Sequence, residues 1–343
     1  MKYMDILKLL WIKGVYPIII LGNAKKDSTN TSFVEYYLNH FSDLKYGVFK
    51  KVKQMPNYKS LVDSGVKISS GATGFQAQQL KKNVIEERLL GSIPFTVSGN
   101  VDRYKFNNED VQFMKRRYSE AYVTKTPDLA ESKWSFWNKP KIVIAGMTKV
   151  VEAVYTTKPL GLGVGVYGIY DFGEFEPYAL TAILNSRYLS YYFRNKFKDK
   201  HLAGGYLAIN KSTIESFPIV EVNFDKQSIL TKLSRYLHWI IGVEKQKSYG
   251  KNKVSEIERL IEGIIDAIIY ELYLPELSQK HNCTIIEHLG ELPKFTESMS
   301  NTQKEEIITT VFYRLNNKHH QLYKSLNKLK EIDEIAIIEG LKD

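Results

Sequence analysis

The hydrophobic pattern of the chain changes near Pro218, and this change limits the folds that it can adopt. Before Pro218, short apolar runs are separated by Gly, Asn and Pro, which is typical of β-strands joined by turns. After Pro218, apolar residues recur every three or four positions over long stretches, as they do on one face of a helix. The sequence therefore predicts an α+β fold, in which a mixed α/β domain is followed by a helical C-terminal domain.

The part before Pro218 predicts strands that are interrupted by helices. The β-type runs are Ser92–Ser98, Lys141–Gly146, Val150–Thr156 and Val164–Tyr170. A helical insertion is predicted at Asn108–Tyr118. Apolar residues at helical spacing predict one further helix over Tyr178–Lys198.

The part after Pro218 predicts four helices. They span about Lys226–Lys247, Val254–Tyr273, Thr302–Leu315 and His319–Leu329, with a linker at Gly250–Lys253. Asp225 is the predicted cap of the first helix. The apolar stripes suit a core or a partner helix, but no strict heptad is sustained. A helical packing domain is therefore favoured over a coiled-coil dimerisation arm.

The first residues have a different character. A short helix is predicted to precede the apolar strand Tyr16–Leu21, and no further strand–helix units follow it. A strand that is apolar on both faces belongs to an α/β sheet. We therefore predict three segments: residues 1–24 as the last piece of an α/β domain, residues 25–222 as the mixed α/β domain, and residues 223–343 as the helical domain.

The net charge of +10 is confined to one part of the chain. Residues 226–343 hold 17 basic and 17 acidic side chains, so residues 1–225 hold the remaining 31 basic and 21 acidic ones. A one-sided basic excess is the electrostatic footprint of a polyanion binder, although a solvated Lys-rich surface gives the same count. The 23 Tyr and 16 Phe supply rings of the kind that meet bases and sugars.

Cysteine content and hydropathy limit where the chain can work. A single cysteine, Cys283, excludes an internal disulfide and a cysteine-based zinc site. The apolar run Val15–Leu21 is far shorter than the roughly 20 residues of a membrane span, and it lacks a signal-peptide cleavage site. These features predict a cytoplasmic protein without a membrane partner.

Known catalytic patterns are missing from the sequence. Amino methylation of DNA bases needs a polar-Pro-Pro-aromatic tetrapeptide, and the chain has no Pro-Pro pair. The cluster Gly161–Gly165 lies between two β-type runs rather than before a helix, so a turn is favoured over a nucleotide loop. The carboxylates Asp171, Glu174 and Glu176 lack the lysine of a nuclease strand, and the histidines have no metal-ligand spacing.

Six short segments, in a fixed order, carry a resemblance to a known family. They are Ile68–Gly74, Phe95–Tyr104, Lys139–Ile144, Leu180–Ser186, Gly204–Lys211 and Ile214–Ile219. This series resembles the C-terminal specificity domain of TaqI-like adenine methyltransferases and of type IIG restriction-modification enzymes. Its last part also resembles the recognition domains of type I specificity subunits.

The resemblance implies a function that is divided between domains. It implies that residues 1–24 are the last strand of a methyltransferase-like domain and that residues 25–222 are a DNA target-recognition domain. This chain is expected to recognise a short sequence in double-stranded DNA, and so to direct adenine methylation, with or without cleavage, by a catalytic domain that is absent from it. S-adenosylmethionine is expected only in that missing domain, so no cofactor and no metal are predicted here. A methyltransferase or restriction catalytic subunit is the second expected partner.

The candidate DNA contacts are polar and basic side chains on the recognisable loops. They are Ser69, Ser70, Thr73, Gln76, Asn100, Arg103, Tyr104, Lys105, Arg116, Arg117, Lys149, Lys196, Lys198, Lys200 and Lys211. Lysine and arginine would contact phosphates, and Arg103 or Gln76 could make bidentate contacts with bases. Gly204 and Gly205 would let the backbone approach a phosphate closely.

Structural roles compete with these assignments. Asn100 could only shape a turn, Lys196–Lys200 could be a solvated helix end, and Tyr104 and Tyr206 could be core aromatics. The segment Leu184–Ser186 is expected to be structural. Two other functions stay open: an enzyme with degenerate motifs, or an assembly subunit that docks a partner through its C-terminal helices.

Overall fold

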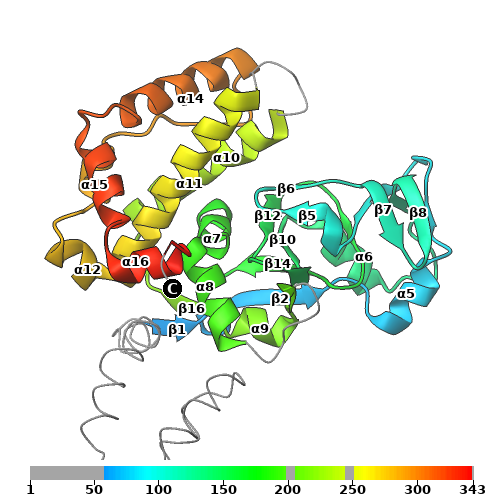
Figure 1. Ribbon diagram of the computed structural model, residues 1–343. Coiled ribbons are helices and arrows are strands. Elements are labelled where there is room, and N and C mark those ends of the chain that lie inside the picture. Colours follow the sequence, from blue (N-terminus) through cyan, green and yellow to red (C-terminus); the bar gives the residue numbers. More distant parts are fainter. Residues whose placement is uncertain (1–57, 198–204, 244–250, 342–343) are drawn as a thin grey trace, which may run out of the picture. The chain divides into compact units, whose positions relative to one another are not determined.

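The computed structural model describes residues 58–197, 205–243 and 251–341 (Figure 1). All of these residues belong to one compact unit. The strand that we predicted at Tyr16–Leu21 therefore lies outside the described residues.

A four-stranded antiparallel sheet lies at the centre of the strand-rich part, in the order β12-β10-β14-β2. Its strands are β2 (Val66–Ser70), β10 (Lys141–Ala145), β12 (Ala153–Thr156) and β14 (Val166–Phe172). All five residues of β10 are buried, as expected for a central strand that is covered on both faces. The predicted β-type runs Lys141–Gly146, Val150–Thr156 and Val164–Tyr170 thus form the neighbouring strands β10, β12 and β14.

A second sheet has the order β13-β4-β9-β3 and contains a parallel pair. Its strands are β3 (Val84–Ile85), β4 (Ile93–Thr96), β9 (Tyr122–Val123) and β13 (Gly161–Leu162). Phe95 and Trp137 are fully buried against this sheet, and their rings meet edge to face at 6.4 Å. Trp137 comes from helix α6 (Glu131–Asn138), which covers the core of this part of the chain.

Short elements complete the strand-rich part. They are β1 (Tyr58–Ser60), β5 (Val101–Asp102), β6 (Lys105–Phe106), β11 (Met147–Thr148), β15 (Leu207–Ala208), β16 (Pro218–Val220), the turns η2 (Val62–Ser64) and η3 (Ser98–Asn100), and the helices α5 (Gly74–Leu80) and α9 (Lys211–Glu215). β1 pairs with β16, and β11 pairs with β15. Residues near the two ends of this part are therefore held side by side.

The predicted helix at Asn108–Tyr118 is wrong, because this segment is a hairpin. It forms β7 (Glu109–Phe113) and β8 (Arg116–Glu120), joined by Met114 and Lys115. Both turn residues have positive φ, 50° and 64°, as a tight two-residue hairpin requires. Val111 and Phe113 are buried while Gln112 between them is exposed, so the apolar period is two rather than 3.6.

The predicted single helix Tyr178–Lys198 is also wrong, because two helices occupy it. They are α7 (Pro177–Leu184) and α8 (Arg187–Lys196), and Ser186 caps the second by accepting a hydrogen bond from Leu189 N. The buried Asn185 side chain accepts from Ala153 N and donates to Ala153 O, both at 2.8 Å. This pair of bonds to β12 gives Asn185 and Ser186 the structural role that we expected.

Seven helices are described after Pro218; the four longest lie close to their predicted positions, and the three shortest were not predicted. The seven helices are α10 (Phe224–Val243), α11 (Lys251–Tyr273), α12 (Pro275–Lys280), α13 (Ile286–Leu289), α14 (Asn301–Leu315), α15 (Gln321–Leu329) and α16 (Asp333–Ile338). Asn223, rather than the predicted Asp225, accepts a hydrogen bond from the first turn of α10, at Lys226 N. The predicted linker also differs, since Lys251–Lys253 belong to α11.

The apolar stripes of these helices are buried inside the molecule. Ile257, Ile261, Ile264 and Ile268 of α11 are at most 2% exposed. α10 packs on α7, and α11 packs on α10 and α8 (Figure 1). The stripes therefore serve a core. The secondary structure changes between β16 and α10, near the predicted boundary, but the division into domains stays a prediction. No described helix has the length and hydropathy to cross a membrane.

Candidate nucleic-acid interface

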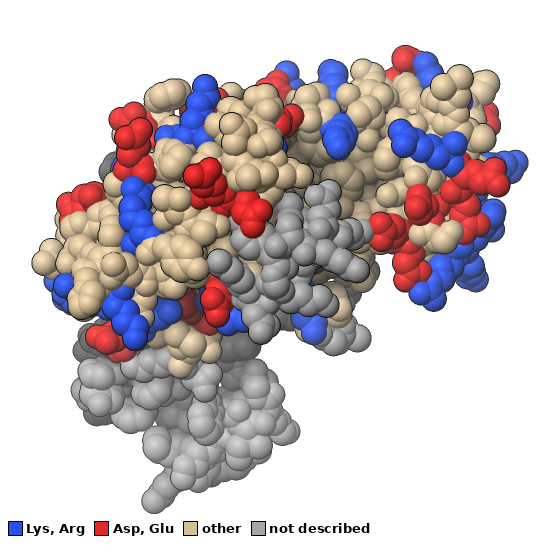
Figure 2. Space-filling view, turned by 90° about the horizontal axis from the view of Figure 1, so that it is seen from above, with Lys and Arg blue, Asp and Glu red and all other residues tan. Residues whose placement is uncertain are grey.

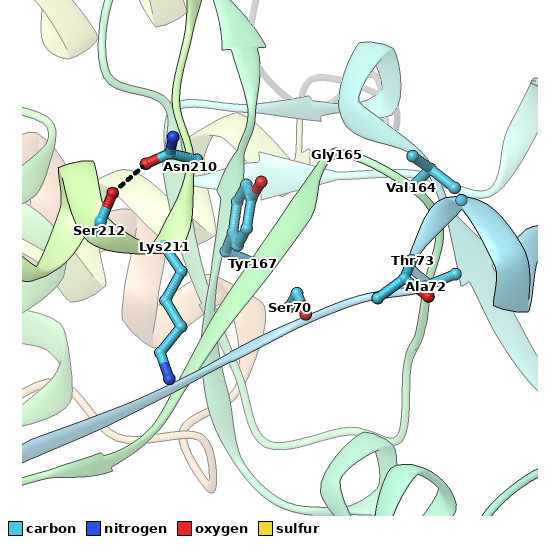
Figure 3. A pocket seen from close by; sticks show the side chains of 10 residues that line it. Ser70, Ala72, Thr73, Val164, Gly165, Tyr167, Asn210, Lys211 and Ser212 are labelled. Atoms are coloured by element: carbon cyan, nitrogen blue, oxygen red, sulfur yellow. Dashed lines mark hydrogen bonds between the residues drawn. The ribbon is translucent and has the colours of Figure 1, made fainter.

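Three loops from distant parts of the sequence meet at an open cleft (Figure 3). They are the end of β2 with the start of α5, the turn between β13 and β14, and the start of α9. The residues that line the cleft are Ser70, Ala72, Thr73, Gly74, Val164, Gly165, Tyr167, Asn210, Lys211 and Ser212. In Figure 3 the side chains of Thr73 and Val164 lie opposite those of Asn210 and Lys211.

Close approach of backbones forms the base of the cleft. A Cβ on Gly71 would lie 2.3 Å from Gly163 O, and one on Gly146 would lie 2.2 Å from Gly165 O. Hydrogen bonds hold these backbone segments together. They run from Gly71 N to Val166 O at 2.7 Å and from Ile209 N to Gly146 O at 2.8 Å. Only glycine fits these two positions, so the strand ends and the turn are held rigidly together.

Two of the three loops end in capped helices. Thr73 and Gln76 form a capping box at the start of α5, in which each side chain accepts from the other's backbone N–H. Asn210 Oδ1 accepts from Thr213 N at 2.9 Å and from the Ser212 hydroxyl at 2.8 Å. Local hydrogen bonds thus hold the polar side chains at the edges of the cleft.

Lys133 of α6 holds the loop between β2 and α5 in place through hydrogen bonds. Its Nζ donates to Ser70 O at 2.8 Å and to Gly71 O at 2.7 Å. Burial lowers the pKa of this amine, because a charged group loses hydration inside the protein. Lys133 therefore positions the loop and does not face solvent as a free cation.

A basic and aromatic pair adjoins the cleft along β11 and β15. Lys149 Nζ lies 5.2 Å from the centre of the Tyr206 ring, a cation–π distance. Met147 N donates to the Ser98 hydroxyl at 2.9 Å, which ties β11 to the turn η3. β11 follows Gly146 directly, and β15 precedes Asn210 closely, so this pair continues the surface of the cleft.

The structure brings six of the predicted contact residues to this region. Ser70, Thr73 and Lys211 line the cleft, and Ser69, Gln76 and Lys149 lie beside it. The Oε1 atom of Gln76 accepts a hydrogen bond within the capping box, so its Nε2 amide is the group that could contact a base. Lys211 forms an ion pair with Glu215 at 3.6 Å and is half exposed.

The polar loop after β4 faces the interior instead. Asn100 donates to Asn107 Oδ1 and to Glu109 O, both at 2.7 Å, so it shapes the turn. The Arg103 guanidinium lies 3.2 Å from Glu262 of α11, and Tyr104 is 2% exposed. Lys105 is exposed and pairs with Asp102 at 3.5 Å. Of these four predicted residues, Lys105 alone presents its side chain to solvent.

The remaining predicted residues are separate from the cleft. Arg116 stacks over Tyr118 at 4.9 Å, and Arg117 pairs with Asp110, all on the β7–β8 hairpin. Lys196 lies 5.2 Å from the Tyr192 ring at the end of α8. Lys198 and Lys200 lie outside the described residues.

Several cleft residues were missed at the level of sequence. Val164 and Gly165 belong to the glycine cluster that we interpreted as a turn, and that cluster was the available signal. Asn210 stands just before a short Lys-Ser-Thr run, which is the pattern of a helix cap. Tyr167 gave no signal, because a tyrosine within a β-type run is ordinary.

The basic excess does not form one continuous patch on the face shown in Figure 2, where basic and acidic side chains are interspersed. Residues 1–57, which lie outside the described residues, hold nine lysines and four acidic residues and thus half of the net charge of +10. Among the described residues no group of three His, Cys, Asp or Glu could hold a metal ion.

A comparison with protein families relates part of this chain to a known domain. Residues 96–219 match the family model of the TaqI-like C-terminal specificity domain. This segment is similar to the TaqI-like specificity domain. The matched segment runs from β4 to β16 and includes two of the three loops at the cleft. β2, before that segment, adds an edge strand to the central sheet of the specificity domain.

Solved structures with related parts include restriction proteins. The type IIG restriction endonuclease BpuSI is 11% identical, with a TM-score of 0.39, over 70% of this chain and 34% of that one. The HsdS subunit from Thermoanaerobacter tengcongensis is 11% identical, with a TM-score of 0.32, over 71% and 54%. The type I S subunit from M. genitalium is 12% identical, with a TM-score of 0.31, over 72% and 58%. The chain thus spans about one third to just over half of these proteins.

No curated protein matches the sequence.

Proposed function

We propose that this chain is the sequence-specific DNA recognition module of a restriction-modification system. The match of residues 96–219 to a specificity domain carries the proposal. The rigid cleft supports it, because a protein that reads bases must hold its polar side chains in fixed positions. In this proposal the cleft and the adjoining β11–β15 pair face the DNA.

The chemistry of the cleft suits both kinds of protein–DNA contact. Lys149 and Lys211 can neutralise phosphates and release counterions, which gives affinity without sequence preference. Ser70, Thr73 and Ser212 carry hydroxyls that can donate to or accept from base edges in the major groove. Sequence preference would come from these hydroxyls, because the close backbone contacts at Gly71 and Gly146 hold the loops of the cleft in place.

The reaction itself is assigned to another domain. We propose that a catalytic domain outside this chain methylates adenine within the recognised site, with or without cleavage, and that S-adenosylmethionine binds there. A methyltransferase or restriction catalytic subunit is then the second partner, and the cytoplasm is the location. The assembly-subunit alternative has no separate support, since the apolar stripes of α10 and α11 are buried within the molecule.

Selection from a random duplex library tests the proposal. We expect the chain to enrich one short motif, and we expect that motif to persist when the selection is repeated at higher salt. Binding that ignores sequence and disappears at higher salt would overturn the proposal, since only a general electrostatic attraction would remain.

Two lysine variants locate the interface. Lys149→Ala and Lys211→Ala should weaken binding to all duplexes alike. Each should reduce the salt-dependence slope by about one, because each lysine would neutralise one phosphate. Lys324→Ala is the matched control, because Lys324 is exposed on α15 in the helical part. An unchanged slope in both test variants would place the DNA on another face.

A further inference from the structure

Four large exposed apolar side chains lie in the cleft lining or on segments that adjoin it. Their exposed fractions are 77% for Phe75, 56% for Met147, 42% for Val164 and 42% for Tyr206. We call these four residues the apolar rim. Exposed apolar side chains that gather at one site mark an interaction surface, whereas single scattered ones are ordinary.

The four residues belong to one region because their neighbours in sequence touch one another. Val164 lines the cleft itself, and Phe75 follows the lining residue Gly74. Met147 follows Gly146, whose backbone approaches Gly165 O. Met147 also pairs with Ala208 in the β11–β15 ladder, two residues beyond Tyr206.

The charge around the apolar rim indicates what covers it. None of the ten residues that line the cleft is acidic, and Lys211 is among them. Lys149 lies over the ring of Tyr206. The partner therefore presents apolar groups and negative charges close together. The major groove of DNA does so, because each thymine displays a methyl group and an oxygen acceptor between the phosphate backbones.

We propose that the apolar rim reads thymine, through contacts with the methyl groups in the major groove. The inference rests on the proposed function and deepens it by naming a base. It predicts that the recognised site contains at least one T·A pair whose thymine methyl is essential to affinity.

Replacing thymine by uracil in the selected duplex tests this directly, since uracil lacks only the methyl group. Each thymine in the site is replaced in turn, and the dissociation constant is measured for each duplex. We expect about a fourfold loss of affinity at a thymine that the rim contacts, which is the free energy of burying one methylene-sized group. Thymines outside the site serve as internal controls.

Two variants connect the effect to the rim. Val164→Thr keeps the shape of the side chain but adds a hydroxyl, and Phe75→Ala removes a ring. Both should lower affinity for the thymine duplex and reduce its advantage over the uracil duplex. Phe224→Ala is the matched control, because Phe224 is 79% exposed at the start of α10, and it should change neither quantity.

The outcomes separate this inference from the proposed function. A selected motif without any T·A pair would overturn the thymine inference and leave DNA recognition intact. Equal affinity for thymine and uracil duplexes would do the same, and the rim would then contact sugars or a protein partner. The absence of any selected motif would overturn both.

Discussion

His238 shows how a single polar residue can join the two parts of the molecule. Its ring is half-buried between α10 and β12, where Nδ1 lies 2.8 Å from Ser234 O and Nε2 accepts from Tyr155 N at 3.2 Å. Because Nε2 is an acceptor, the ring must be neutral with its proton on Nδ1. Burial lowers the pKa of His238 from 6.5 to about 4.

This pKa makes stability depend on acid. The unfolded chain binds a proton at His238 below pH 6.5 and the folded chain only below about pH 4, so stability is lost as the pH falls between these values. The loss amounts to about 3 kcal/mol at most. We expect His238→Gln to be less stable at pH 7 but to lose less stability on acidification to pH 4, measured by urea unfolding. Identical losses in both proteins would contradict this assignment.

At the scale of elements, glycines decide how closely strands and loops can approach. Gly71 directly follows β2 where the backbone meets the β13–β14 turn, and Gly146 directly follows β10 at the same turn. Gly74, three residues beyond Gly71, begins α5, and a Cβ at this position would have nothing within 4 Å. Glycine is therefore required for steric reasons at position 71 but not at position 74.

A pair of alanine variants tests this difference. Gly71→Ala places Cβ against backbone oxygens that cannot move aside, so we expect a loss of about 3 kcal/mol in the free energy of unfolding, or failure to fold. Gly74→Ala should be neutral or stabilise the chain by up to about 1 kcal/mol, through the helix propensity of alanine. The free energy of unfolding of both variants is measured by denaturant unfolding. Equal losses of stability would show that the backbones do not approach closely at Gly71.

At the scale of the whole molecule, a partly buried charge network connects the strands to the C-terminal helices. Arg103 of the β5–β6 turn pairs with Glu262 of α11. One turn further along α11, Asp266 lies 3.3 Å from Arg187, which also reaches Glu339 at 3.1 Å after α16. Burial raises the pKa of Asp266 to about 7, although both arginines oppose the shift.

A double-mutant cycle measures how strongly this network couples the two parts. Arg103→Met and Glu262→Met should each cost about 2–3 kcal/mol, because each leaves a charge partly buried without its partner. The double variant should recover much of that loss, giving a coupling of about 1–3 kcal/mol in urea unfolding. The exposed pair Lys125 and Glu131 is the control, with an expected coupling below about 1 kcal/mol. Equal couplings would reduce Arg103 to a surface contact.

The candidate site was partly visible in the sequence. Ser70, Thr73 and Lys211 were predicted because they stand in recognisable loops, and the structure brings them to one cleft. Arg103 and Asn100 stood in an equally polar loop, yet they turn inward. The direction of a polar side chain depends on partners such as Glu262, which are distant in the sequence and leave no local signal.

By itself, the sequence determined the α+β class, the central strands and the long helices, because apolar periodicity is a local property that burial enforces. Tertiary structure decided the rest. The segment Asn108–Tyr118 is a hairpin because Val111 and Phe113 both face one core. The helix over Tyr178–Lys198 breaks where Asn185 bonds to Ala153 of a distant strand. The cleft exists only because Gly71, Gly146 and the β13–β14 turn meet in space, and contacts between distant segments are set by packing rather than by any local pattern.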